Sequence, residues 1–312
     1  MTKPRRHIPG QVAMVTRRCA QRRYFLRPDS YINNVLPFEV GKAANRYDQQ
    51  VYGALAMSNH IHLELGDATG RRSDFMRDSM SAIANSRNRD LGREEHFWGS
   101  GPFNDTVLLD RDAIERKLIY IWTNPVRAGL VKRAEDWPGF KILPKDWGTK
   151  IRVDKPERFY GRRNPDVVEF TPQPPPGYDD MSLEEVREHF QNLLEEAEDK
   201  LNAALEEEKR HFAGVATVEA VDPMSQPSTE ETKTRHIPRF ASKDFELRSA
   251  ARAIYRDFVD RYETCRQRWL NSRKKKHPKR VQFPAGTVQL RRCAPVQCDA
   301  PLDDEPGLFA SP

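Results

Sequence analysis

Two histidines separated by a single residue are the part of this chain with the clearest chemical potential. In the segment AMSNHIHLEL, residues 56–65, His60, His62 and Glu64 alternate with apolar residues. Successive side chains of a strand point to opposite faces, so these three would share one face. Neutral imidazoles bind divalent cations, and a metal held there with open positions can polarise a phosphate. The spacing equally suits two histidines on the polar face of a half-buried strand, and both interpretations stay open.

The elements around this motif predict an α+β domain. Apolar periodicity and turn residues predict strands at 11–16, 50–57, 60–65 and 107–109, and helices at 30–43, 73–91 and 112–122. Asp29 or Ser30 is expected to cap the first helix, and Asn124-Pro125 to stop the last one. The order β-α-β-β-α-β-α predicts a ferredoxin-like antiparallel sheet with helices on one face.

The second half of the chain is expected to be a separate, mainly helical region. We predict a first domain over 1–150, a Pro-rich connection over 151–180 and a charged helical extension over 181–312. A capping box of Ser182 and Glu185 begins an acidic amphipathic helix. Residues 213–241 resemble a flexible linker, and a helix with a basic end starts near Ser242. The two helices suit either a hairpin or two independent surface helices.

Basic residues gather in two blocks that suit a polyanion. Residues 1–30 hold eight Lys or Arg against the single acid Asp29, and residues 266–292 hold ten and no acid. Such clusters bind nucleic-acid phosphates through counterion release, although they can also be merely solvating. The candidate DNA-binding residues are Arg17, Arg18, Arg22, Arg23, Tyr24, Arg273, Lys274, Lys275, Lys276, Lys279 and Arg280.

The remaining composition favours a cytoplasmic protein. Four scattered cysteines do not resemble a disulfide framework, and no apolar run long enough for a membrane span occurs. Cys293 and Cys298, with Cys265 and His277 upstream, suggest a zinc site, but the set has no second paired knuckle. Idle thiols are the favoured interpretation.

Several blocks together resemble the insertion-sequence-200-like transposases, in the branch associated with repetitive extragenic palindromes. They are Arg5-Arg6 before Pro9-Gly10, Met57 to Leu63, Asn88 to Arg93, Phe97-Trp98, and Tyr120-Ile121 through Asn124-Pro125-Val126-Arg127-Ala128-Gly129-Leu130-Val131, followed by Asp136-Trp137. The resemblance covers residues 5 to about 140. It implies a nuclease that acts on single-stranded or hairpin DNA, cutting and rejoining strands through a 5′ phosphotyrosine link.

This resemblance also implies a set of site residues. His60 and His62 fall on the family's ligands for Mg²⁺ or Mn²⁺, and Asn88 is a candidate third ligand. The nucleophilic tyrosine is expected about five residues before Asn88, where this chain has Ile83. No tyrosine occurs between Tyr52 and Tyr120.

Two other tyrosines are candidate substitutes. Tyr120 lies in a helix beside Ile121 and Trp122, so a packing role is favoured over catalysis, and Tyr24 lies in the basic segment. The sequence therefore predicts a DNA-binding transposase-family protein, with a homodimer as a candidate assembly, whose strand cleavage is impaired. The alternative is a domesticated, non-catalytic DNA-binding or regulatory protein whose helical tail binds a protein partner.

Overall fold

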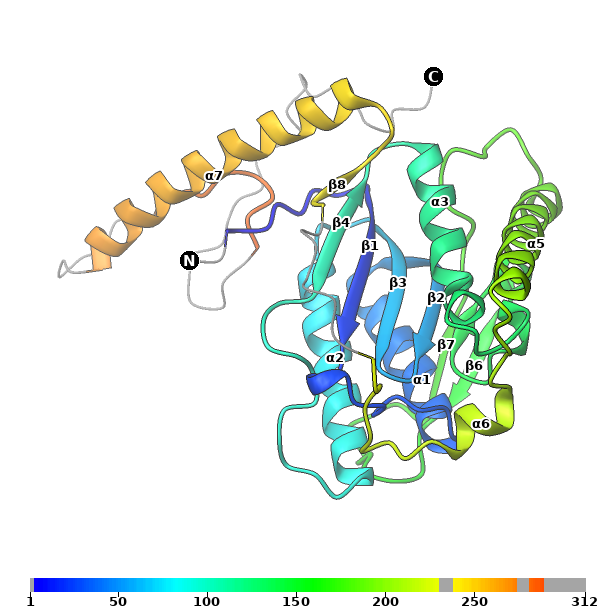
Figure 1. The fold of residues 1–312 in the computed structure, drawn as a ribbon. Coiled ribbons are helices and arrows are strands. Elements are labelled where there is room, and N and C mark those ends of the chain that lie inside the picture. Colours follow the sequence, from blue (N-terminus) through cyan, green and yellow to red (C-terminus); the bar gives the residue numbers. More distant parts are fainter. Residues whose placement is uncertain (1–2, 230–237, 274–280, 289–312) are drawn as a thin grey trace.

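A computed structural model describes residues 3–229, 238–273 and 281–288 of the chain (Figure 1). Its centre is a six-stranded sheet in the order β5-β2-β3-β1-β4-β8. The strands are β1 (Gln11–Arg18), β2 (Gln49–Met57), β3 (His60–Asp67), β4 (Asn104–Leu108), β5 (Lys141–Ile142) and β8 (Phe240–Ala241). All neighbouring pairs are antiparallel except β4 and β8, which are parallel. The predicted α+β class is confirmed.

Helices cover both faces of this sheet (Figure 1). On one face, α1 (Ser30–Tyr47) and α2 (Arg72–Asp90) form a core with the Ile61, Leu63 and Leu65 side chains of β3. On the other face lie α3 (Arg111–Trp122) and, outside it, α5 (Leu183–Glu207). One detail of the expected fold therefore differs: the helices do not all lie on one face. The apolar stripes of two helices show that each is buried, but they do not say on which side of a sheet.

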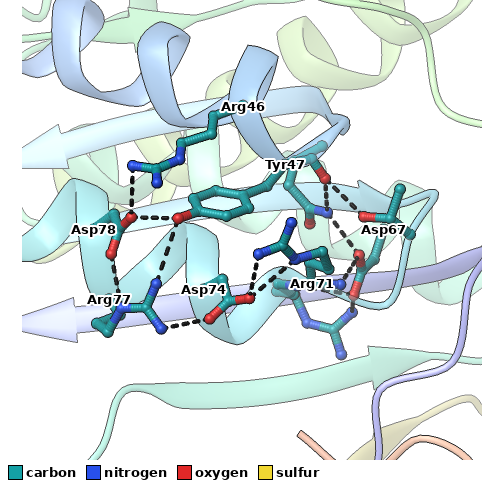
Figure 2. Close-up of polar contacts among 10 residues, drawn as sticks. Arg46, Tyr47, Asp67, Arg71, Asp74, Arg77 and Asp78 are labelled. Atoms are coloured by element: carbon teal, nitrogen blue, oxygen red, sulfur yellow. Dashed lines mark hydrogen bonds and ion pairs between the residues drawn. The ribbon is translucent and has the colours of Figure 1, made fainter. Parts of the chain in front are cut away.

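Local signals explain where α1 begins and how it is held. The Asp29 side chain accepts a hydrogen bond from Ile32 N, at 2.9 Å, as an N-cap. At the other end, Figure 2 shows the Tyr47 hydroxyl donating to Asp78 of α2, which also accepts from Arg46. These contacts fix α1 against α2.

A polar cluster holds the start of α2 in the same way. The carboxylate of Asp67, the last residue of β3, accepts from Arg71 N at 2.8 Å and pairs with the buried guanidinium of Arg72 at 3.1 Å (Figure 2). The turn from β3 into α2 is thereby fixed on the side of the sheet away from α3.

A small second sheet was not expected from the sequence. It pairs β6 (Ile151–Asp154) with β7 (Val167–Phe170) and packs on α1. Gly41 makes this contact possible, because a Cβ there would lie 2.3 Å from Phe170 Cδ1. Short elements complete this part: η1 (Ala20–Arg22), α4 (Asn124–Arg127), η2 (Ala134–Asp136) and η3 (Pro144–Asp146).

The C-terminal region joins the first domain at two places. The apolar face of α5 packs on α3 and α4, with Phe190 against Trp122 and Trp147. Further along, β8 extends the main sheet and leads into α7 (Phe245–Arg273), which extends away from the sheet (Figure 1). No helix in the described ranges is both long and apolar enough to span a membrane.

Part of the segment expected to be a linker has a definite path. It contains α6 (Val215–Ala220) and continues to Thr229 across the basic segment after β1. We call residues 215–229 the strap. Tyr24 N donates to Ser225 O at 3.1 Å, and Arg27 donates to Glu219 O at 2.7 Å.

Candidate active site

The two histidines lie side by side at the start of β3, on the face of the sheet that α3 covers. Their ring centroids are 4.7 Å apart and the rings are nearly perpendicular. His62 is 4% exposed, and His60 is partly buried. The alternation of β3 produces this arrangement, since Ile61 and Leu63 point into the opposite core. The sequence prediction that both imidazoles share one face agrees with this geometry.

Hydrogen bonds hold one nitrogen of each ring. Asn59 Nδ2 donates to Arg22 O at 3.2 Å, which orients its Oδ1 as the acceptor 2.7 Å from His60 Nδ1. The proton of neutral His60 therefore lies on Nδ1, and the lone pair of Nε2 remains for another ligand. His62 Nδ1 lies 2.7 Å from Thr16 Oγ1 on the neighbouring strand β1.

Both imidazoles are in the neutral form that binds metals. Burial lowers the pKa of His60 to about 4, and the positive charge of Arg18 lowers it further. Burial also lowers the pKa of His62 well below its usual value, with smaller contributions from His60 and Lys117. At neutral pH neither ring carries a proton that would compete with a cation.

Helix α3 brings a tyrosine to this pair. Asp110 caps the helix by accepting from Ala113 N at 2.7 Å. Close approach of α3 to the sheet depends on Gly53 of β2, because a Cβ there would lie 2.5 Å from Leu118 Cδ2. The ring of Tyr120 meets the ring of His62 edge to face, with 5.7 Å between centroids.

Tyr120 is accessible and lies between two cations. Its side chain is 37% exposed, whereas its neighbours Ile121 and Trp122 are fully buried. Lys117 Nζ lies 5.4 Å and Arg127 Cζ 5.8 Å from the centre of the Tyr120 ring. This surrounding favours an anionic group beside the phenol.

Glu64 adds a buried carboxyl to the same face. It is completely buried, and neither carboxyl oxygen has a hydrogen-bond partner in the part of the chain that the structure describes. Burial raises its pKa well above the usual value, against the opposing charge of Lys117. Buried polar groups are nearly always satisfied, so this unpartnered carboxyl is an exception, and its raised pKa favours the neutral form.

The donor set fits a hydrated divalent ion better than a closed structural site. Among the described residues there is no group of three or more His, Cys, Asp or Glu that could hold a metal. The protein would therefore supply the two Nε2 atoms. Mg²⁺ characteristically keeps several waters and takes oxygen ligands from a phosphate substrate, which leaves room for DNA.

The residues expected on the nucleophile helix lie elsewhere. Ile83 of α2 is completely buried in the core formed with Ile61 and Leu63, on the sheet face opposite to the histidines. Asn88, the candidate third ligand, lies on the same helix and donates from Nδ2 to Glu95 O at 2.8 Å. The structure brings neither residue to the histidines. It brings Tyr120 instead, the residue for which the sequence favoured a packing role.

Several of the candidate DNA-binding residues lie near this site. Arg18 is paired in register with His60, whereas Arg17 is paired with Ile61 on the opposite face and donates to Gly101 O at 2.6 Å. Arg22 donates to Thr229 O and to Thr229 Oγ1, at 2.5 and 2.9 Å, and Arg23 donates to Met224 O. The strap thus occupies donors of Arg22 and Arg23 with neutral oxygens.

Most of the C-terminal residues predicted to bind DNA or zinc lie outside the described part of the chain. The basic run Lys274, Lys275, Lys276, Lys279 and Arg280, together with His277, Cys293 and Cys298, lies outside the described residues. Arg273 ends α7, and Cys265 is a free thiol on that helix. The zinc site therefore stays a prediction.

Four residues of the site were missed by sequence reasoning: Thr16, Asn59, Lys117 and Arg127. Asn59 carried a signal, since it directly precedes His60. Lys117 is one helical turn before Tyr120, so a catalytic assignment of Tyr120 would have drawn attention to it.

The comparisons with known proteins give limited similarity. No protein-family model matches the chain, and no curated protein matches it. A solved structure of a REP-associated tyrosine transposase bound to a REP hairpin is similar over 47% of this chain and 85% of that chain, at 20% identity and a TM-score of 0.37. A functional assignment therefore has to rest on the residues and contacts of this chain.

Proposed function

We propose that this protein is a metal-dependent nuclease of the transposase type, acting on single-stranded or hairpin DNA. In this proposal His60 and His62 hold Mg²⁺ or Mn²⁺, and Tyr120 is the nucleophile. The edge-to-face contact between Tyr120 and His62 carries the proposal, because it puts an accessible phenol beside the imidazole pair. The resemblance of the His60 and Asn124 blocks to insertion-sequence-200-like transposases supports the choice of substrate.

The chemistry needs one displacement at phosphorus. The Tyr120 oxygen forms a bond to phosphorus while the bond from phosphorus to the 3′ oxygen of the preceding nucleotide breaks. The phenolic proton is lost and the released 3′ oxygen gains one, so protons and electrons balance. The phosphotyrosine keeps the energy of the broken bond, and attack by a 3′ hydroxyl reverses the step.

The residues around Tyr120 would position the phosphate. A divalent ion bound by the two Nε2 atoms would polarise the phosphate oxygens and stabilise charge on them. Lys117 and Arg127 lie close to the phenol ring, and the charge of Arg18 acts on His60, so three cations lie near the site. Fixed positive charges of this kind stabilise the transition state without reorganising.

A covalent-adduct assay tests the proposal. The full-length protein is incubated with an end-labelled hairpin oligonucleotide carrying single-stranded flanks, with Mn²⁺ or with EDTA. We expect a labelled protein–DNA band that requires Mn²⁺ and disappears in Tyr120→Phe. Tyr24→Phe is the matched control, since it removes the other candidate hydroxyl, and it should keep the band.

The competing function is a non-catalytic DNA-binding or regulatory protein. That alternative predicts hairpin binding with no adduct and no cleavage in any variant. An adduct that persists in Tyr120→Phe would instead show that another nucleophile acts at this site. Either result contradicts the role assigned to Tyr120.

A further inference from the structure

We propose that the loop joining β6 to β7, residues 155–166, is a second contact surface for single-stranded nucleic acid. An unpaired base stacks on Phe159, and neighbouring phosphates pair with Arg162 and Arg163. This inference rests on the proposed function, because it extends the DNA path away from the histidine site. The loop was not among the candidate DNA-binding residues.

Phe159 is presented as a fixed aromatic surface. Its side chain is 44% exposed, and its backbone has a φ of 68°, which is costly for a residue with a Cβ. The ring meets Tyr31 of α1 nearly perpendicularly, with 6.2 Å between centroids. Arg158 lies over the Tyr31 ring at 4.6 Å. A strained backbone and a supported ring hold an apolar face toward solvent.

The charges of the loop suit phosphates. Lys155, Arg158, Arg162 and Arg163 outnumber the acids Glu157 and Asp166. Lys155 pairs with Asp166, whereas Arg162 and Arg163 are both exposed and have no acidic partner in the described part of the chain. The two free guanidinium groups follow Phe159 by three and four residues. Aromatic rings interleaved with basic groups are the arrangement that binds single strands without base-specific contacts.

A series of ion pairs, in which arginines and aspartates alternate, runs from this loop to Arg27 in the segment after β1. Arg27 pairs with Asp29 at 3.1 Å, and Asp29 pairs with Arg87 at 2.6 Å. Arg87 then pairs with Asp90 at 2.5 Å, and Asp90 pairs with Arg158 at 2.7 Å.

The near end of this series is next in sequence to a contact with the turn before β3. Leu26, next to Arg27, donates from its N to Ser58 O at 2.9 Å, two residues before His60. The far end is Arg158, beside Phe159. The loop is therefore fixed relative to the site. Because it packs on Tyr31 of α1, on the sheet face opposite to the histidines, a strand leaving the site would pass round the end of the sheet to reach Phe159.

Nucleic acid fits this surface better than an acidic peptide. A peptide would satisfy the two arginines, but it gives no reason for a supported, exposed aromatic ring. A nucleotide supplies both a phosphate and a flat base, and stacking accepts every base.

The test is a binding titration of the full-length chain in EDTA, so that no strand is cut. A fluorescent hairpin with ten-nucleotide single-stranded flanks is compared with the same hairpin without flanks. We expect Phe159→Ala to weaken binding of the flanked hairpin by about 10-fold and to leave the blunt hairpin unchanged. Phe159→Trp should bind as well as wild type.

The arginines are tested by the salt dependence of the same titration. Replacing both Arg162 and Arg163 by Ala should reduce the slope of log affinity against log salt by about 1.4, because each phosphate neutralised on a single strand contributes about 0.7 to that slope. Arg152→Ala is a matched control on the neighbouring strand β6, because Arg152 is already paired with Glu169 of β7. Phe245→Ala is the control for the ring, because Phe245 is 67% exposed on α7.

Three results would overturn the proposal. The first is unchanged affinity in both Phe159→Ala and the double arginine variant, and the second is an equal decrease in the controls. The third is that these same variants bind a poly-glutamate peptide more weakly than the wild type does while their affinity for DNA is unchanged. This result would assign the surface to an acidic protein partner.

Cleavage is assayed separately, so that this proposal and the proposed function can fail independently. If the wild type cuts no DNA but Phe159→Ala binds the flanked hairpin more weakly, the nuclease is rejected and this surface is kept. If the wild type cuts DNA normally and Phe159→Ala binds the flanked hairpin as well as wild type does, the nuclease is kept and this surface is rejected.

Discussion

The ring of Tyr120 stands edge to face against the ring of His62, with 5.7 Å between their centroids. This contact shows that α3 covers the face of β3 that carries the two histidines. It also explains why Ile83 is apolar, since α2 lies on the other side of the sheet and contributes to the core. Replacing the groups that create and maintain this contact should therefore have measurable effects.

Asn59 is expected to act as a positioning residue for the metal. In Asn59→Ala the His60 Nδ1 loses its fixed acceptor, and the ring is free to adopt the wrong tautomer or orientation. We expect Mn²⁺ affinity to fall about 10–100-fold, as is typical when the group that orients a metal-binding histidine is removed. Calorimetric Mn²⁺ titration measures this. Asn45→Ala, which removes a bond to Glu169 O on the protein surface, should change nothing.

Acid should destabilise the protein through its buried histidines. The pKa of His60 is lowered to about 4 in the folded chain, against about 6.5 when unfolded. Between these values the unfolded chain binds a proton that the folded chain does not, so stability is lost as pH falls through this window. From pH 7 to 4.5 we expect His60 alone to account for roughly 2 kcal/mol.

Urea unfolding of wild type and of a double His60→Gln, His62→Gln variant measures this effect. The variant should lose less stability over the same pH range. His189→Gln is the control, because His189 is half-exposed beside Glu115. Equal losses in wild type and the double variant would contradict the assignment.

Replacing Glu64 by Gln should stabilise the metal-free protein. The folded Glu64 has a pKa raised by burial, so above the unfolded value the folded chain holds a proton that the unfolded chain has released. Stability therefore falls as pH rises, and Gln removes that loss. We expect a gain at pH 8 of about 1.4 kcal/mol for each unit by which burial raises the pKa of Glu64. Glu157→Gln, an exposed carboxyl, should have no effect.

The strap should limit access to Arg22 and Arg23. Replacing residues 219–229 by a flexible Gly/Ser segment of equal length should release the strap, so that the backbone oxygens of Met224 and Thr229 no longer hold the guanidinium groups of Arg23 and Arg22. We expect tighter DNA binding, with the salt slope steeper by about 1.4 for two added phosphate contacts. Adding Arg22→Ala and Arg23→Ala should cancel the gain. Weaker binding after the replacement would show that the strap itself contacts DNA.

Gly53→Ala should move α3, the helix that carries Tyr120. The added Cβ would meet Leu118 of α3, which must shift, and overpacking of this kind costs about 1–3 kcal/mol. We expect a lower free energy of unfolding and a loss of adduct formation larger than that caused by equal destabilisation elsewhere. Phe258→Leu is the control, since it removes buried apolar volume on α7, away from α3.

The sequence was sufficient for the parts of the fold that local pattern controls. The strict alternation from His60 to Leu65 predicted β3, and Asp29 predicted the start of α1. The class of the fold followed from the order of these elements. The short strands β5, β6 and β7 were missed, because two to four residues give too little periodicity.

The pairing of Tyr120 with the histidines could not be found from spacing along the chain. Tyr120 follows His62 by 58 residues, and only the packing of α3 against β2 and β3 brings the two rings together. The apolar neighbours Ile121 and Trp122 favoured a packing role, yet they point into the core while Tyr120 remains accessible at the edge of the helix. Adjacent residues of a helix point in different directions, so a buried and an accessible side chain can follow one another.

The parallel pairing of β8 with β4 has a consequence for the order of biosynthesis. Val107 of β4 is paired with Phe240 of β8, which follows it by 133 residues. At a translation rate of about 5–20 residues per second, the edge of β4 waits between about 7 and 27 s for that partner. The nascent chain would expose this unpaired edge until residue 240 has left the ribosome.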